Sequence, residues 1–249
     1  SGSDHTVALN SDVLVNIDLN QVFHLHNTTK PKVTVVYKKL PKELISDVNS
    51  ILEIDESDKV LSHELFQGGD KEVYNMSTDI FVVDTPFLIE KLEEEAAKEE
   101  PRKLRYVLRD LAVAENAFAY EYTGYLSNIH SVKAYFDANL DMLESHKFYK
   151  LFAPNQKVYT KVKNEEPTYY AASSEVKVSQ FASGSIVRGK VEHSVVSRNV
   201  DLAEGSNVSY SVLFPRVTVG KGATVEYAIV DKGVEIADGV TIRGTENNP

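Results

Sequence analysis

The residues best suited to chemistry lie in the stretch YTGYLSNIHS, residues 122–131. An apolar strand is predicted to end in this corner, and a helix is predicted to begin at Ser131, whose hydroxyl can cap the first turn. In α/β proteins, ligands bind outside the carboxyl ends of the strands, so we expect Ser127, Asn128 and His130 to face a substrate. The corner contains an amide, Asn128, and no carboxylate.

Two histidines alternate in the segment HLH, at positions His24 and His26. The surrounding stretch, residues 17–27, has the pattern of a helix, on which two residues separated by one other point about 200° apart. We therefore do not expect these two side chains to bind one metal ion together, and interpret them as solvated or packing residues.

Composition limits the classes of function. The chain has 249 residues, a formal charge of −10, a pI of about 5.2 and no cysteine. The acidic balance argues against nucleic acid or an anionic membrane as a partner. The lack of cysteine excludes disulfides, thiolate zinc sites and a cysteine nucleophile, and agrees with a cytoplasmic location. No apolar run approaches the roughly 20 residues of a membrane helix.

Residues 1–152 are predicted to form an α/β domain, because strand and helix patterns alternate along them. Residues 153–175 contain two prolines and little periodicity, and are interpreted as an interdomain linker. The expected strands cover residues 6–12, 32–39, 50–55, 60–65, 79–84 and 116–125, and the expected helices cover 17–27, 85–100, 103–113 and 131–144.

An internal repeat of 17 residues occupies the last part of the chain. Its matching columns are Val200, Val217 and Val234; Leu202, Val219 and Ile236; and Gly205, Gly222 and Gly239. Aliphatic residues also recur at steps of five or six, which gives three short sides per coil and predicts a triangular parallel β-helix over 176–249. One inward aliphatic per side should stack on its counterpart in the next coil, so the second column is predicted to be internal.

These features resemble a known family. The segments VALNSDVLVNID and GYLSNIHSVKAYFDANLDML, with the repeat, are similar to the bacterial ADP-glucose pyrophosphorylases (glucose-1-phosphate adenylyltransferases). The resemblance implies a Rossmann-like, GT-A-like nucleotidyltransferase domain followed by a left-handed parallel β-helix, in a tetramer that acts in glycogen biosynthesis. It also implies that the amino-terminal part of the first domain, with its glycine-rich phosphate loop, is missing from this sequence.

The resemblance also implies a metal-binding role for the corner at residues 122–131. In catalytic members, a motif like SGD and a corner like GYWRDVGT supply two aspartates that hold Mg²⁺ against the substrate phosphates. Here the first motif is LNSD, which keeps Asp12, and the second is GYLSNIH, which places Asn128 where the second aspartate belongs. A neutral amide cannot balance charge, so we expect Asp12 alone to remain as a metal ligand and the Mg²⁺ site to be severely weakened.

Two further positions depart from the family pattern. The sugar-phosphate lysine of a motif like FxEKP is matched by Phe66, which has no cation. The family segment SMGIYVF resembles STDIFVV, which keeps Ser77 but replaces glycine by Asp79, an anion beside the expected phosphate. The resemblance thus assigns sugar-phosphate or nucleotide binding to Asp12, Ser77 and Asp79, and marks Asn128 and Phe66 as degenerate catalytic positions.

This pattern is similar to the noncatalytic, regulatory subunits of Gram-positive bacteria. We therefore expect little activity alone, Mg²⁺ as cofactor only if the protein is active, and a heterotetramer with a catalytic ADP-glucose pyrophosphorylase subunit. A sugar-phosphate or nucleotide effector could bind Arg188, Arg216 or Arg243 on the β-helix. The alternatives are a competent glucose-1-phosphate adenylyltransferase, an acyltransferase with His193 as base, and a scaffold without ligand.

Overall fold

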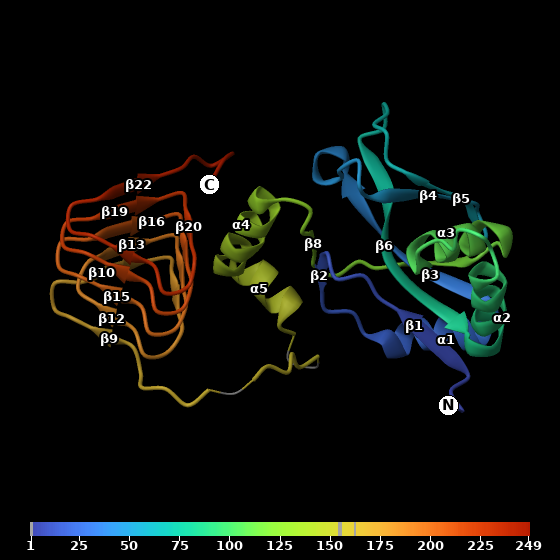
Figure 1. The fold of residues 1–249 in the computed structure, drawn as a ribbon, viewed down its shortest axis with the longest axis horizontal. Coiled ribbons are helices and arrows are strands. Elements are labelled where there is room, and N and C mark those ends of the chain that lie inside the picture. Colours follow the sequence, from blue (N-terminus) through green and yellow to red (C-terminus); the bar gives the residue numbers. More distant parts are fainter. Residues whose placement is uncertain (1, 154–155, 162) are drawn as a thin grey trace. The chain divides into compact units, whose positions relative to one another are not determined.

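The computed structural model describes residues 2–153, 156–161 and 163–249 (Figure 1). The chain divides into two compact units, residues 1–130 and 131–249. The first contains a mixed sheet with helices, and the second contains a parallel β-helix preceded by helices. An α/β sheet followed by a parallel β-helix confirms the predicted fold class.

A six-stranded mixed sheet forms the first unit. The strands run in the order β5-β4-β6-β3-β7, and β1 pairs with the carboxyl-terminal part of β6. The pair β3/β7 is parallel, whereas β6 is antiparallel to each of its neighbours. The bounds are β1 His5–Ala8, β3 Val33–Pro41, β4 Ser50–Ile54, β5 Val60–Leu65, β6 Val73–Asp84 and β7 Phe118–Glu121.

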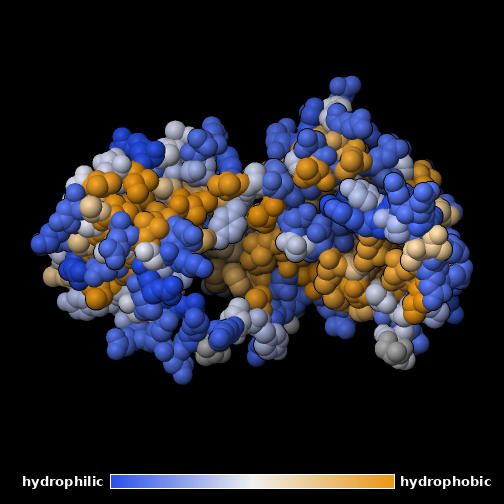
Figure 2. All heavy atoms as spheres, in the orientation of Figure 1, coloured by the Kyte–Doolittle hydropathy of each residue, from blue (hydrophilic) through white to orange (hydrophobic). Residues whose placement is uncertain are grey.

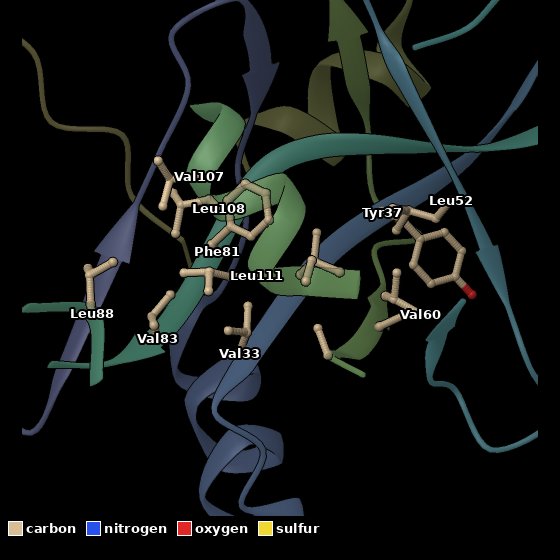
Figure 3. Close-up of a cluster of buried hydrophobic side chains, with 14 residues drawn as sticks. Val33, Tyr37, Leu52, Val60, Phe81, Val83, Leu88, Val107, Leu108 and Leu111 are labelled. Carbon is tan, nitrogen blue, oxygen red and sulfur yellow. The ribbon is translucent and has the colours of Figure 1, made fainter. Parts of the chain in front are cut away.

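Helices cover both faces of this sheet, because β3 and β6 are apolar on both sides. On one face, Val33 and Phe81 share a buried cluster with residues of α2 (Thr85–Ala96) and α3 (Leu104–Ala114), as Figure 3 shows. On the other face, α1 (Leu19–Thr29) packs through Val22 against residues such as Val36 and Val82 of the same two strands. The alternation of side chains along a strand accounts for this division.

A short antiparallel ribbon of two strands forms a sheet of its own, separate from the large sheet. It joins β2 (Val13–Val15) to β8 (Leu126–Asn128), with Val13 opposite Asn128. The N–H of Ile129 donates to the carbonyl oxygen of Asp12 at 2.7 Å. The ribbon thus makes neighbours of the two strand ends that the sequence singled out.

The second unit begins with helices α4 (Val132–Leu140) and α5 (Ser145–Leu151). The hydroxyl of Ser131 accepts the N–H of Ala134 at 3.1 Å, so the predicted cap is confirmed. Helix α4 packs on the β-helix, with the rings of Tyr135 and Phe214 6.3 Å apart. These contacts place the helices with the coils, so the two units divide at a position earlier than the sequence-based boundary at residue 152.

Three parallel sheets form the sides of the β-helix. Leu202, Val219 and Ile236 are consecutive partners in one of them and all three are buried, which confirms the predicted column. The first strand already lies within residues 153–175, the stretch that the sequence assigned to a linker. The sheets are β10 Glu175–Lys177, β13 Lys190–Glu192, β16 Asn207–Ser209, β19 Thr224–Glu226 and β22 Thr241–Arg243; β11 Gln180–Phe181, β14 Val195–Val196, β17 Val212–Leu213 and β20 Ile229–Val230; and β9 Tyr169–Tyr170, β12 Ile186–Val187, β15 Asp201–Leu202, β18 Thr218–Val219 and β21 Glu235–Ile236.

The step between coils is 17 residues, except that one step is 15. The corner that follows β12 contains only Arg188 and Gly189, whereas the corner in the next coil contains residues 203–206. A Cβ on Gly189 would lie 2.1 Å from the hydroxyl oxygen of Ser206, so only glycine fits this short corner.

A column of serines ties successive coils together. Ser194 and Ser211 are fully buried, and their hydroxyls donate to the carbonyls of Glu192 and Ser209, each at 2.8 Å. The same hydroxyls accept backbone N–H groups one coil further along, so each serine satisfies a buried donor in its neighbour. None of the helices described has the length and apolar character that crossing a bilayer requires.

Candidate functional site

Asn128, the amide of the corner, is buried at the end of β8 with 7% of its surface exposed. Its Nδ2 donates to Oδ1 of Asn49 at 2.7 Å and to the carbonyl oxygen of Leu44 at 3.2 Å. Its Oδ1 accepts Nδ2 of Asn49 at 3.2 Å. Both ends of the amide are therefore engaged inside the protein, and its oxygen already has a donor.

Asp12 lies next to this amide in the ribbon, because it directly precedes Val13, the residue opposite Asn128. Its side chain is only partly buried. The structure thus brings together the two positions that the resemblance assigns to Mg²⁺. Mg²⁺ prefers anionic oxygen ligands in near-octahedral geometry, and of these two positions only Asp12 supplies a carboxylate. The pair does not form the two-carboxylate site that the chemistry needs.

Phe66 is buried at the end of the β4–β5 hairpin, where the family pattern has a lysine. Its ring contacts that of Tyr74 edge to face at a centroid distance of 5.0 Å and packs in a cluster with Leu40 and Met76. Its N–H donates to the carbonyl oxygen of Asn49 at 2.9 Å. A phenylalanine that packs in the core cannot bind a phosphate.

Asn49 links the two degenerate positions, and the sequence interpretation missed it. Its side chain exchanges hydrogen bonds with Asn128, and its main chain accepts from Phe66. The N–H and hydroxyl of Ser46 also donate to its Oδ1, at 2.9 and 3.0 Å. The only available signal was a polar residue directly before an apolar strand, a pattern that many turns share.

Asp79 lies in an irregular part of β6, where the register with β3 passes from Ile80 to Ser77. Its backbone is left-handed, with φ of 52°, a conformation that aspartate tolerates better than most residues. The extra residues change the direction of the Asp79 side chain, as β-bulges do. The hydroxyl of Ser77 donates to Oδ1 of Asp79 at 3.4 Å.

The charge of Asp79 is balanced by helix α3. Arg109 donates from Nη2 to Oδ2 of Asp79 at 2.8 Å and from Nε to Oδ1 at 3.3 Å, and Nη2 of Arg105 lies 3.5 Å from Oδ2. Asp79 is therefore a buried carboxylate paired with arginine, a partner that the sequence interpretation of an anion beside the expected phosphate did not include. The role of Ser77 and Asp79 toward a phosphate stays a prediction.

His63 extends this polar group. Its Nε2 forms a hydrogen bond with the hydroxyl of Ser50 at 2.9 Å and lies 3.9 Å from Oδ1 of Asp79. Burial lowers the pKa of His63 to about 4, so the ring is neutral near pH 7. A neutral imidazole next to the Asp79–Arg109 pair contributes a hydrogen bond and no charge.

Comparison with known proteins finds one family model and several relatives that match this chain. Residues 162–248 match the family described as GlmU-like, C-terminal hexapeptide. The chain is 30% identical, over 58% of its length and 40% of the relative, to the glycogen biosynthesis protein GlgD of Bacillus subtilis. It is 26% identical to the glucose-1-phosphate adenylyltransferase of Thermosipho africanus, and 28% identical to that of Geobacillus stearothermophilus; each match covers 82% of this chain.

The chain is a homologue of these proteins. The predicted resemblance to the ADP-glucose pyrophosphorylases is thereby confirmed. The chain spans about half the length of the curated relatives it matches: 40% of the Bacillus subtilis protein, and 50% and 53% of the other two.

The other corner residues are distributed differently from the expectation. Ser127 pairs with Leu14 inside the ribbon and is partly buried, whereas His130 is exposed. The ring nitrogen Nδ1 of His130 lies 3.2 Å from the carbonyl oxygen of Asn128. Of the three side chains expected to face a substrate, His130 is therefore the one that is fully exposed.

The candidate residues on the β-helix make local contacts. The ring of His193 stacks on Tyr210 at 4.8 Å, and Tyr210 stacks on Tyr227 at 4.9 Å, which favours a packing role for this histidine. Arg188 pairs with Asp201 and Arg243 pairs with Glu226, each at 2.6 Å. The third arginine, Arg216, is exposed.

Proposed function

We propose that this chain is part of a regulatory subunit of glucose-1-phosphate adenylyltransferase in glycogen biosynthesis. That enzyme converts ATP and glucose 1-phosphate to ADP-glucose and pyrophosphate. The subunit has little or no activity alone and modulates a catalytic partner subunit. The observation that carries the proposal is the buried amide of Asn128, bonded at both ends where the family pattern has a metal-binding aspartate.

Charge is the physical reason. The transferred phosphoryl group is strongly anionic, and its transition state depends on cations held in fixed positions. One ion pair near 4 Å is worth about 4 kcal/mol at an effective dielectric constant near 20. The chain lacks a carboxylate at Asn128 and a cation at Phe66, so two electrostatic contributions are lost from one site.

A subunit that keeps the fold but lacks this chemistry can still act by binding a catalytic subunit. Each coil of the β-helix packs on its neighbours with a filled interior, and apolar side chains are exposed on both units among hydrophilic ones (Figure 2). Such surfaces can pair with another subunit. A partner that binds the active state of the catalytic subunit more tightly raises the population of that state. We expect a heterotetramer, with a sugar phosphate or a nucleotide as effector.

The test uses the full-length protein and a purified catalytic glucose-1-phosphate adenylyltransferase subunit. Pyrophosphate release is measured for each alone and for mixtures over a wide range of ratios, and the mass in solution is measured in parallel. We expect almost no turnover from this protein alone, a mixed complex, and a changed rate or effector response in that complex. Absence of a complex and of any kinetic change would refute the proposal.

The alternative is a competent adenylyltransferase, and one observation favours it. Asp12 is retained and its side chain is only partly buried, so one metal ligand remains accessible. This alternative requires Mg²⁺-dependent turnover by the full-length protein alone at a rate comparable to that of the catalytic subunit. The same pyrophosphate assay therefore separates the two proposals.

A further inference from the structure

Two histidines and an aspartate meet in the first unit, on the three elements β1, α1 and β6. His5 begins β1 and is the direct cross-strand partner of Asp84 at the end of β6. His26 projects from α1 into the same place and is almost fully buried. One ligand atom from each residue lies within 4.8 Å of the other two.

The distances match a tetrahedral metal site. Nδ1 of His5 lies 3.4 Å from Oδ1 of Asp84, and Nε2 of His26 lies 3.3 Å from the same oxygen. Nitrogen and oxygen ligands bind zinc at about 2.0–2.2 Å, so two ligands of a tetrahedral ion are roughly 3.4 Å apart. The ligand nitrogens of the two histidines lie within 4.8 Å of each other.

The hydrogen bonds on the outer side of the rings have the arrangement that metal-bound histidines use. Nε2 of His5 lies 2.8 Å from Oδ1 of Asn27, and Nδ1 of His26 lies 2.8 Å from the hydroxyl of Thr34. The oxygen of Asn27 can only accept, so Nε2 of His5 carries the proton of a neutral ring. Nδ1 of His5 then turns a lone pair toward the carboxylate oxygen of Asp84.

Two lone pairs that face each other require a cation or a proton between them. Nδ1 of His5 is buried and lacks a hydrogen-bond partner among the described residues. Asp84 is also the residue before α2, a position where aspartate usually caps the helix. Its side chain makes no cap hydrogen bond. Its Oδ2 lies 3.3 Å from Nζ of Lys32, which leaves Oδ1 for the histidines.

We propose that His5, His26 and Asp84 bind a divalent transition-metal ion, with zinc as the ion that fits best. His5 and Asp84 supply the entry path, since their side chains are 25% and 29% exposed, and solvent supplies the fourth ligand. The ion ties the first strand of the unit to α1 and to the end of β6. The site is separate from Asp12 and Asn128 and does not depend on the function proposed above.

The charges near the rings also bear on metal binding, because a cation close to His26 would repel the ion. The groups around His26 are His5, Asp84 and Thr34, together with Lys32 on the outer oxygen of Asp84. Lys32 is the only nearby permanent cation among these groups, and it lies on the side away from the two rings.

The test is metal titration of the full chain after chelator treatment. Zn²⁺ is followed by calorimetry, and Co²⁺ by visible absorption, because tetrahedral cobalt absorbs far more strongly than octahedral cobalt. We expect one ion per chain and a tetrahedral cobalt spectrum. We also expect a loss of at least about tenfold in affinity with His5→Gln or Asp84→Asn, since even loss of an outer-shell partner costs 10–100-fold.

The matched control is His24→Gln, which removes an exposed histidine from the same helix. It should leave metal affinity unchanged. Because His26 is buried, its substitution can unfold the unit, so the test relies on His5 and Asp84, with circular dichroism to verify folding. Absence of binding, an octahedral cobalt spectrum, or equal affinity in wild type, His5→Gln and Asp84→Asn would overturn the proposal.

Discussion

At the scale of single residues, the amide pair Asn49–Asn128 shows how a binding position can become a packing position. Each side chain donates to the oxygen of the other, and Asn128 also donates to the main chain at Leu44. A carboxylate at position 128 has no N–H to give, and would place its charge against two oxygens. The local structure is therefore built for an amide.

This leads to a prediction for Asn128→Asp. The change removes two donated hydrogen bonds from a buried site, so we expect the free energy of unfolding to fall by about 1–3 kcal/mol. Denaturant unfolding monitored by circular dichroism measures it. Asn116→Asp is the control, because Asn116 is exposed and its backbone, with φ of 47°, accepts aspartate. Equal stability of the two variants would contradict the prediction.

His63 gives a prediction for pH. Its pKa is about 4 in the folded state, lowered from 6.5 by burial, and Asp79 and Arg109 act on it in opposite directions. Between pH 6.5 and about 4, the unfolded chain therefore binds a proton that the folded chain refuses. Neutral His63 therefore contributes about 3 kcal/mol to the free energy of unfolding above pH 6.5. This contribution is lost as the pH falls through the folded-state pKa.

The measurement is the free energy of unfolding from pH 7 to pH 4 for the wild type and for His63→Gln. Other groups titrate in the same range, but they contribute to both proteins, so the difference between the two curves isolates His63. Glutamine can keep a hydrogen bond to Ser50. If the two curves of unfolding free energy against pH were parallel, the burial of His63 would not be the cause of the loss of stability in acid.

Residue type and family pattern predicted which positions would be unusual, but not what surrounds them. Asp12, Asn128 and Phe66 were found from the sequence, because each interrupts a motif with a known chemical requirement. Asn49, Arg105 and Arg109 were not, because their partners are distant in the chain and no local pattern marks a residue that will be paired by folding.

At the scale of elements, the β-helix was the most predictable part, because one internal side chain per side must recur with the coil. The Leu202–Val219 pairing follows directly from the repeat of 17. The step of 15 at Gly189 could not be predicted from the repeat, because the two-residue corner depends on the close approach of Gly189 to Ser206 in the next coil. The irregular register at Asp79 likewise has no signal in a strand pattern.

The column supports a direct test with Val219→Asp. Val219 is fully buried between Leu202 and Ile236, so the change places a charge without a partner inside the coil. We expect the free energy of unfolding to fall by about 3–5 kcal/mol. The control is Thr218→Asp, one residue earlier on the same strand but exposed. Thermal unfolding should separate the two clearly, and similar midpoints would contradict an internal column.

At the scale of the whole molecule, the sequence predicted an α/β sheet followed by a β-helix, and the homologues agree with it. Helix α4 is the exception, since it contacts β17 of the coils, and α5 belongs to the same unit. A pattern along one helix can show that one face is apolar, but it cannot say which partner covers that face.

The proposed regulatory role makes a prediction for Asp12→Ala in the full-length protein. If turnover belongs to the partner subunit, the activity of the mixed complex should remain within about twofold of wild type, a change of about 0.4 kcal/mol in the barrier. The control replaces the corresponding aspartate of the catalytic subunit, which should abolish turnover. Loss of activity with Asp12→Ala alone would assign catalysis to this chain.

The step of 17 residues that most coils share also restricts how the second unit can change in length. The strands of each coil pair with the strands of the coils next to it, so removal of residues 213–229, one full step of 17, joins two matching positions and leaves every remaining aliphatic in its column. A deletion of nine or ten residues in the same place turns inward residues toward solvent. Insertions and duplications in a gene for this protein are therefore expected to survive in units of seventeen codons, so that relatives differ by whole coils.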